Sequence, residues 1–273
     1  MATRVRAVRF RSSLLEEIEC FLHDSGQELS AFVNDAVERR LHGEGGSPPS
    51  RRAGPRTVPD LAQCAEEYRR ALLARDARRA RSVVERADDA GADVIDVYQH
   101  ILRPALEEIG DLWALDEISV AQEHFATEVT TQVMATLAAD RRRAPTGGRL
   151  AFVGGTPDEL HQLGARMVAD VLEREGWEVI GLGAATPAHA LAELVAADCP
   201  DLVALSTSTV GRLPGVEETL GELRAQDGAA TIALGGALYR GPVVDLARGW
   251  GADIVTSDLR ELLSELRQRF PVA

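Results

Sequence analysis

The sequence lacks the features of membrane and secreted proteins. No apolar run in its 273 residues approaches the length of a membrane-spanning helix, and the first residues, MATRVRAVRFRSS, contain no apolar segment of the secretory type. The three cysteines, Cys20, Cys64 and Cys199, lie far apart and form no C-x-x-C pair. We therefore expect a cytoplasmic protein with no membrane partner and no cysteine-based metal site.

The phosphate-binding motifs of nucleotide enzymes are also missing. No G-x-G-x-x-G follows the apolar run RLAFVGG at residues 149–155, and the chain contains no Walker A sequence. Only Asp158 and Glu159 follow this run, whereas a phosphoacceptor domain has clustered aspartates at its strand ends. These absences argue against dinucleotide, nucleoside triphosphate and phosphoacceptor sites, and we expect no enzymatic activity.

Acidic residues outnumber basic ones overall, but the N-terminus is a basic segment without acids. The formal net charge is −13, yet residues 1–11 contain four arginines, Arg4, Arg6, Arg9 and Arg11, and no acid. Because the chain as a whole is acidic, we expect nucleic-acid binding only at this basic segment.

Two stretches rich in glycine, proline or arginine divide the chain. Residues 43–57, GEGGSPPSRRAGPRT, have the composition of a flexible linker, and a second break lies at residues 141–149, RRRAPTGGR. The sequence therefore predicts a multidomain protein with α and α/β parts. The expected parts are an N-terminal module (1–42), the linker (43–57), a helical domain (58–143) and an α/β domain (147–273).

The N-terminal module combines one short strand with two helices. Residues 8–11, VRFR, alternate between apolar and basic side chains, which is the pattern of a strand. Amphipathic helices are predicted in SLLEEIECFLHDSG and from Ser30 to about residue 41. A strand without a neighbour leaves its hydrogen bonds unpaired, so we expect this module to pair with a second copy.

This order of elements resembles the ribbon-helix-helix family of bacterial repressors, over VRAVRFRSSLLEEIECFLHDSGQELSAFVNDAVERRL. The resemblance implies a two-stranded ribbon in the DNA major groove, with Val5, Ala7 and Arg9 facing the base edges and the helix start at Ser30 near a phosphate. Arg9 is the main candidate for base readout, because arginine pairs with guanine O6 and N7. The alternative is that Arg9 only keeps an edge strand soluble.

The sequence of residues 58–143 predicts a four-helix bundle. Amphipathic stretches cover residues 60–75, 76–91, 93–113 and 117–140, with Pro104 expected to bend or divide the third. The segment WALDEISVAQEH places Trp113 at the end of one helix and Glu123 and His124 at the start of the next. These three side chains should meet at one end of the bundle; alternatively, Trp113 is ordinary core and the other two are solvated or bonded to the backbone.

The last part alternates between apolar runs and helical patterns. The runs RLAFVGG, WEVIGLG, DLVALSTS, AATIALGG and ADIVTSD are typical of strands buried on both faces. We therefore expect a five-stranded, doubly wound parallel sheet of the flavodoxin-like type. Ligands of such sheets bind beyond the carboxyl ends of the strands, which is where DELHQLG lies.

Three short elements recur at those strand ends. Glu159-x-His161-x-x-Gly164 comes first, Ser206-x-Ser208 follows after 41 intervening residues, and Gly235-Gly236 follows after 26 more. This closely resembles the signature D-x-H-x-x-G, S-x-L or S-x-T, and G-G of cobalamin-binding domains of the methionine synthase and mutase type. Glutamate replaces the usual aspartate at position 159.

The resemblance implies a role for each of these residues. His161 would be the lower ligand of cobalt, in place of the cofactor's own base, and Glu159 would orient its imidazole. Gly164 would let the displaced nucleotide tail pass close to the helix. Ser206 and Ser208 would bind the buried base of the tail, and Gly235 and Gly236 would leave space for it.

The bundle adds a second resemblance. W-x9-E-H is similar to the helical cap of adenosylcobalamin-dependent photoreceptor repressors, related to light-sensing regulators of carotenoid synthesis. It implies that Trp113 packs on the upper axial group, Glu123 hydrogen-bonds that group and His124 lines the pocket. The photoreceptors have a second histidine after the tryptophan, where this chain has Ala114.

Together these patterns predict a cobalamin-dependent transcriptional regulator, most simply a light-responsive repressor, that binds operator DNA as a dimer or tetramer. Adenosylcobalamin is the expected cofactor, with methylcobalamin as the alternative form. Two other functions stay open: a corrinoid carrier subunit of a methyltransferase system, and a cobalamin sensor that acts through protein–protein contacts.

Overall fold

The computed structural model describes residues 60–139, 147–226 and 230–271. The predicted ribbon-helix-helix module with Val5, Ala7, Arg9 and Ser30, and the predicted linker, lie outside these residues. Among the helices that are described, none is long and apolar enough to cross a membrane.

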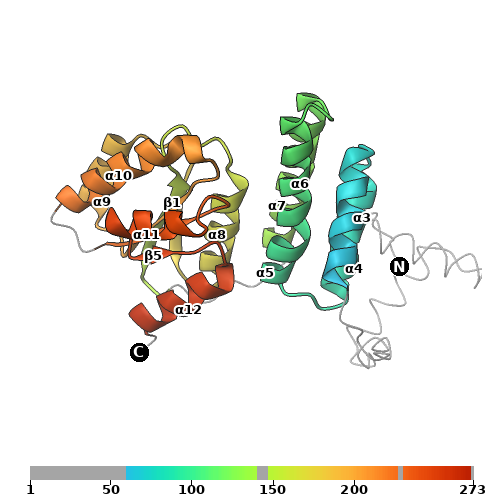
Figure 1. The fold of residues 1–273 in the computed structure, drawn as a ribbon. Helices are drawn as coiled ribbons and strands as arrows, with labels where there is room; N and C mark the ends of the chain where they lie inside the picture. Colours follow the sequence, from blue (N-terminus) through green and yellow to red (C-terminus); the bar gives the residue numbers. More distant parts are fainter. Residues whose placement is uncertain (1–59, 140–146, 227–229, 272–273) are drawn as a thin grey trace, which may run out of the picture. The chain divides into compact units, whose positions relative to one another are not determined.

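The predicted helices of the first part are present (Figure 1). They are α3 (Leu61–Leu73), α4 (Ala77–Asp89), α5 (Val94–Val97), the π-helical segment η1 (Tyr98–Leu102), α6 (Arg103–Ala114) and α7 (Val120–Ala139). The carboxylates of Asp60 and Asp76 accept hydrogen bonds from backbone N–H groups in the first turns of α3 and α4. Such caps satisfy amides that have no partner within the helix, and so define where these helices begin.

Pro104 changes the third predicted helix without dividing it. The chain runs through α5, η1 and α6 without a turn, and the π-helical segment ends two residues before Pro104. Proline has no backbone N–H for the carbonyl four residues earlier, so the regular α-helical pattern cannot continue through it. The wider π-helical turn at residues 98–102 accommodates this missing bond.

The second part is the predicted five-stranded parallel sheet. Its elements are β1 (Leu150–Gly155), α8 (Leu163–Arg174), β2 (Glu178–Gly183), α9 (Ala188–Asp198), β3 (Leu202–Ser206), the 3-10 turn η2 (Val210–Arg212), α10 (Leu213–Ala225), β4 (Thr231–Gly235), α11 (Pro242–Gly249), β5 (Ile254–Val255) and α12 (Leu259–Arg269). The strand order is β2-β1-β3-β4-β5, and every neighbouring pair is parallel. The order reverses between β1 and β3, which is the switch point where such sheets bind ligands.

Both faces of the sheet are covered. Ala151 and Val153 of β1 belong to one buried cluster, together with residues of α8 and α12. Phe152, between them, belongs to a second cluster with residues of α9 and α10. This alternation of side chains between two apolar faces explains why the strands read as unbroken hydrophobic runs.

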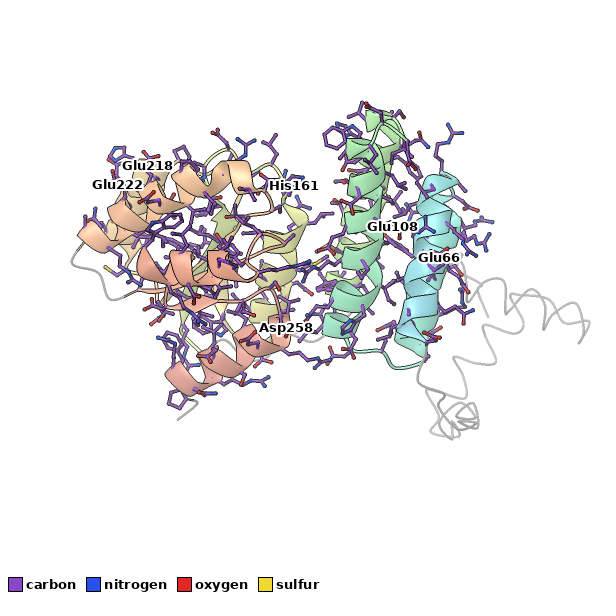
Figure 2. All side chains as sticks on the ribbon, viewed as in Figure 1. Glu66, Glu108, His161, Glu218, Glu222 and Asp258 are labelled. Atoms are coloured by element: carbon purple, nitrogen blue, oxygen red, sulfur yellow. The ribbon has the colours of Figure 1, made fainter. Side chains whose placement is uncertain are left out.

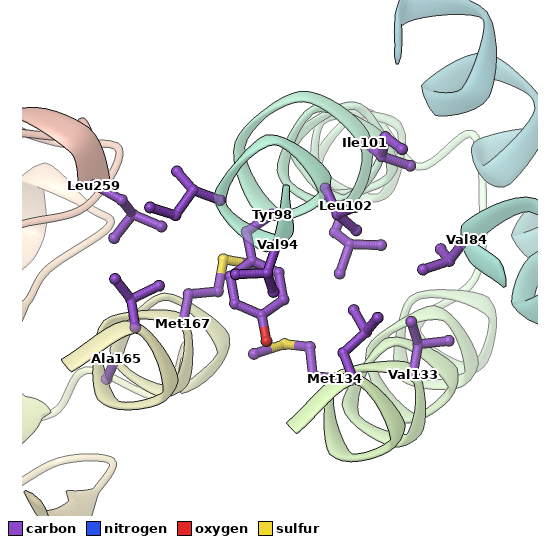
Figure 3. Close-up of a cluster of buried hydrophobic side chains, with 14 of the residues drawn as sticks. Val84, Val94, Tyr98, Ile101, Leu102, Val133, Met134, Ala165, Met167 and Leu259 are labelled. Atoms are coloured by element: carbon purple, nitrogen blue, oxygen red, sulfur yellow. The ribbon is translucent and has the colours of Figure 1, made fainter. Parts of the chain in front are cut away.

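The helical part and the α/β part share one core. Tyr98 and Met134 from the helices belong to the same buried cluster as Met167 of α8 and Leu259 of α12 (Figure 3). The Tyr98 hydroxyl donates to the Asp170 carboxylate on α8 at 2.7 Å. Burial raises the pKa of Tyr98, so this hydroxyl keeps its proton and remains a donor.

A second group of contacts joins the helices to the start of α12. The side-chain Nε2 atom of Gln99 donates to the Asp258 carboxylate at 2.9 Å, and the side-chain Oε1 atom of Gln99 accepts from the backbone N–H of Leu259 at 3.2 Å. The Arg103 guanidinium donates to the carbonyl of Ser257 at 2.8 Å. The break predicted near residues 141–149 therefore does not separate two independent cores.

We expect Tyr98→Phe to lower the free energy of unfolding by about 1.5–3 kcal/mol, because the partly buried Asp170 carboxylate loses one of its donors. Tyr68→Phe is a matched control: Tyr68 is also fully buried, but its hydroxyl bonds Thr130 within the helical part at 2.9 Å. Loss of that neutral bond should cost about 0.5–1.5 kcal/mol. Urea unfolding of the full chain measures both, and a loss at Tyr98 no larger than at Tyr68 would contradict this account of the interface.

Candidate functional site

The predicted site residues converge at the carboxyl ends of three neighbouring strands. Ser206, the last residue of β3, lies in register with Gly155 on β1 and with Gly235 on β4. The loop after β1 carries Glu159 and His161 and ends where α8 begins at Leu163. The parallel sheet therefore brings together residues that are more than seventy positions apart in the sequence.

Glu159 and His161 form the centre of the site. The Glu159 side chain is only 1 % exposed, and its Oε1 atom accepts from both the backbone N–H and the ring Nδ1 of His161, at 2.9 and 2.5 Å. Its other oxygen, Oε2, accepts from the backbone N–H of Ser208 at 2.6 Å. An ionised carboxylate can only accept, so the proton of a neutral imidazole lies on Nδ1, and Nε2 keeps a free lone pair.

Local contacts determine the charge of this pair. Burial by itself would raise the pKa of Glu159, but hydrogen bonds from the His161 ring, its backbone and Ser208 outweigh burial and hold that pKa below its usual value. The bond to Glu159 raises the pKa of His161, burial opposes the rise, and the charges of Glu159 and Glu123 add to it. Glu123 belongs to α7, so this predicted cap residue lies within electrostatic range of the histidine.

The imidazole of His161 is oriented by Glu159 but exposed to solvent. The His161 side chain is 61 % exposed and lies at the edge of the α/β domain (Figure 2). Its Nε2 atom makes no hydrogen bond to another residue that the structure describes. Within the described ranges there is also no group of three or more His, Cys, Asp or Glu side chains that could hold a metal ion.

Gly164 and Ser206 face each other across the start of α8. A Cβ atom at position 164 would lie 2.9 Å from the Ser206 hydroxyl oxygen. Ser206 is buried, and its hydroxyl makes no hydrogen bond within the described parts of the chain. A Cβ atom at Gly235 would lie 3.1 Å from the carbonyl of Thr256. The missing side chain at Gly164 thus leaves space beside the Ser206 hydroxyl, and the missing side chain at Gly235 leaves space beside the Thr256 carbonyl.

Two of the predicted residues make contacts that the sequence did not indicate. Ser208 binds Glu159 through its backbone N–H, whereas a hydroxyl role was expected. Gly236 has a φ of +118°, and a Cβ atom there would lie 2.2 Å from the carbonyl oxygen of Thr207. In the structure, Gly236 therefore makes room for the backbone of the neighbouring strand.

Three buried hydroxyl groups beside the site were missed. The Thr156 and Thr207 hydroxyl oxygens lie 3.0 Å apart, and the Tyr239 hydroxyl donates to Thr207 at 3.1 Å. Threonine and tyrosine at strand ends carry no spacing signal. Only the position of Thr207 between Ser206 and Ser208 could have drawn attention to it.

The predicted cap residues lie at the ends of two successive helices. Trp113 is the penultimate residue of α6 and is 46 % exposed, which excludes the alternative of an ordinary core tryptophan. Glu123, in the first turn of α7, accepts from the Thr127 hydroxyl and lies 2.8 Å from Nδ1 of His124. The side chain of His124 is 74 % exposed.

Comparison with known proteins gives matches over both described parts. Two family models, each described as a B12 binding domain, match residues 64–138 and 150–263. The HTH-type transcriptional repressor CarH of Myxococcus xanthus is 31 % identical over 194 residues, 69 % of this chain and 64 % of CarH. Trimethylamine corrinoid protein 1 of Methanosarcina acetivorans is 26 % identical over 199 residues, 70 % of this chain and 90 % of that protein.

A solved structure has the same fold. The monomethylamine corrinoid protein of Methanosarcina barkeri superposes with a TM-score of 0.65 over 76 % of this chain and 99 % of that one, at 18 % identity. The chain thus spans less than two thirds of the length of CarH, but most of the length of the corrinoid proteins it resembles.

We expect Gly236→Ala to destabilise the α/β domain by at least about 2 kcal/mol, because the backbone conformation is strained for alanine and the new methyl group meets a carbonyl oxygen. Gly221→Ala is the control: this helical glycine on α10 has nothing within 4 Å of the added atom, so alanine should be neutral or stabilising. Thermal unfolding of both variants tests this. Equal midpoints would show that position 236 has room for a side chain.

Proposed function

We propose that the chain is a cobalamin-dependent transcriptional regulator, most simply a repressor, that binds the cofactor through His161. The two B12 binding domain models, which match its helical and α/β parts, support the cofactor. The observation that carries the cofactor site is the pair of Glu159 and His161, which leaves Nε2 free at the exposed edge of the sheet. Similarity to the repressor CarH over the helical and α/β parts supports the regulatory role. The relatives are regulators and corrinoid proteins, not enzymes, in line with the absence of enzymatic activity expected from the sequence.

The residues present fit this cofactor. Cobalamin would supply a cobalt ion, and His161 would hold that ion through its free ring nitrogen Nε2. Glu159 holds the Nδ1 proton, and thereby directs the Nε2 lone pair outward and raises the basicity of the ring.

The facing pair Gly164 and Ser206 would receive the displaced nucleotide tail. The Ser206 hydroxyl can bond a heteroatom of the buried base, and the missing side chain at Gly164 leaves room beside it. Gly235 would leave space for the tail at the end of β4. The hydroxyl of Ser208 is free to join them, because only its backbone N–H is used by Glu159. Gly236 supports the same edge of the sheet by allowing the close approach of Thr207.

The cap residues would form the upper side of the site. Trp113 presents an exposed aromatic face, and Glu123 and His124 present polar groups from the next helix. Adenosylcobalamin is the form we favour, because a large aromatic side chain with a carboxylate suits an adenosyl group better than a methyl group. Ala114 cannot act as a second cobalt ligand, so in this chain a response to light would rest on loss of the upper group itself.

Regulation requires that cofactor state changes DNA binding. A ligand shifts such an equilibrium only by its different affinity for the two states, so the cap must pack differently when the upper ligand changes. The DNA-binding residues we propose are Val5, Ala7 and Arg9 on a paired ribbon and Ser30 at a helix start. The arginine-rich residues 1–11 support this role, and pairing of ribbons would make the active form a dimer or tetramer.

A corrinoid carrier subunit is the second candidate. The specific observation in its favour is coverage: the chain matches 90 % of the length of a trimethylamine corrinoid protein. A carrier would use the same His161 site, but it has no need of the basic N-terminal segment. A cobalamin sensor that uses this segment for protein contacts is the remaining alternative.

We expect His161→Ala to weaken adenosylcobalamin binding by at least roughly tenfold and to change the absorption spectrum of the bound cofactor, because the protein ligand is lost. Glu159→Gln should act in the same direction through poorer orientation of the ring. His189→Ala is the control, since its imidazole lies on α9 with a 78 % exposed side chain and pairs with Glu193. Spectrophotometric titration in the dark measures all three. Wild-type affinity and spectrum in the His161 variant would remove the proposed ligation.

We expect the protein loaded with adenosylcobalamin to retain DNA from upstream of its own gene in a gel shift, and Arg9→Ala to weaken that retention roughly tenfold or more at matched salt. Arg51→Ala, in the predicted linker, removes the same charge and should have a much smaller effect. The assay is repeated after green light, alongside the oligomer size. Cobalamin binding without DNA retention would favour the carrier or sensor, and no difference between dark and light would exclude a light switch.

A further inference from the structure

Three buried hydroxyl groups meet behind the proposed cofactor site. Thr156, Thr207 and Tyr239 are 1 %, 0 % and 3 % exposed. The hydroxyl oxygen of Thr207 lies 3.0 Å from that of Thr156 and accepts from the Tyr239 hydroxyl at 3.1 Å. Thr207 is therefore the centre of a hydrogen-bond network that contains no residue of the binding signature.

Each hydroxyl belongs to a different loop of the site. Thr156 begins the loop after β1 that carries Glu159 and His161, and its carbonyl accepts from the Glu159 N–H at 3.0 Å. Thr207 directly follows β3, between Ser206 and Ser208. Tyr239 follows β4, and its N–H donates to the carbonyl of Gly236 at 3.4 Å. One oxygen atom thus connects the three loops that follow β1, β3 and β4.

The hydrogen-bond donors and acceptors of the three hydroxyl groups match one another. Burial raises the pKa of Tyr239 to about 12, so the phenol stays protonated and donates to Thr207. A threonine hydroxyl has one proton and two lone pairs, so Thr207 can accept from Tyr239 and donate to Thr156 at the same time. The backbone of Thr207 is fixed as well, because its N–H donates to the Gly235 carbonyl at 2.9 Å.

We propose that Thr207, supported by Thr156 and Tyr239, is a positioning residue that fixes His161 and Ser206 relative to each other. This inference rests on the proposed binding of cobalamin through His161. If His161 binds cobalt and Ser206 binds the tail of the same cofactor, the distance between these two residues must be fixed. The side chain of His161 is too exposed for its own packing to fix that distance. The three hydroxyl groups are buried and bonded to one another, so they can fix this separation from the interior of the domain.

Substitutions that remove only the hydroxyl groups test this role. Thr207→Val keeps the shape of the side chain but leaves two buried hydroxyls without a partner, and Tyr239→Phe removes one donor. We expect the affinity of the full-length protein for adenosylcobalamin to fall by roughly tenfold or more in Thr207→Val and less in Tyr239→Phe, as for the loss of buried hydrogen bonds. The fraction of bound cofactor whose spectrum shows histidine ligation should fall in the same order.

Two controls separate positioning from general stability. Thr207→Ser keeps the hydroxyl and should restore both affinity and spectrum. Thr219→Val changes another fully buried threonine, whose hydroxyl donates to the Gly215 carbonyl at 2.7 Å within α10, and should leave both unchanged. Thermal unfolding without cofactor is recorded for every variant; should Thr207→Val fail to fold, Tyr239→Phe decides the question.

The outcomes distinguish this inference from the proposed function. Wild-type affinity and spectrum in both Thr207→Val and Tyr239→Phe, with binding impaired in His161→Ala, would overturn the positioning role alone. Equal losses in Thr207→Val and Thr219→Val would overturn it too, because the effect would then be one of stability. Wild-type binding in His161→Ala would overturn the ligation itself, and the positioning role with it.

Discussion

One buried carboxylate holds the candidate site together. Glu159 is almost fully removed from water, where an ionised carboxylate persists only if its oxygens are hydrogen-bonded. Its side chain accepts from His161 and from the N–H of Ser208, and its carbonyl accepts from the N–H of Ala185. The loops after β1, β2 and β3 therefore meet at one residue. Because the carboxylate orients the imidazole, His161 can be fixed in direction while its far nitrogen faces solvent.

This convergence depends on close packing of strand ends. Ser206 lies in register with a glycine on each neighbouring strand, and Gly236 allows the Thr207 carbonyl to approach where a side chain would collide. Glycine at these positions has two physical uses in the same few residues. At Gly164 it keeps space beside the Ser206 hydroxyl, and at Gly236 it lets two backbone segments come into contact.

The sequence predicted the sheet well because its strands are unbroken apolar runs. The spacing of Glu159, His161 and Gly164 singled them out as candidates, and the structure adds that Glu159 and His161 form a hydrogen-bonded pair. The sequence did not predict the Thr156–Thr207–Tyr239 network, since hydroxyl pairs between loops leave no periodic pattern. It did not indicate that the backbone N–H of Ser208 binds Glu159, because every residue but proline has such a group. The shared core was missed for a related reason: an apolar helix face shows that something is buried, not which distant element buries it.

The shared core also restricts how the helical part can respond to a ligand. Around Tyr98 the helices are joined to α8 and α12 by buried apolar contacts and hydrogen bonds, so moving them there would expose apolar surface and leave Asp170 without one of its donors. Around Trp113 the constraints are much weaker, because Trp113, Leu115 and Val120 are all substantially exposed. The free-energy cost of rearrangement is therefore lowest at the α6–α7 turn. A change in what these residues contact can alter the turn while the core around Tyr98 keeps the two parts together.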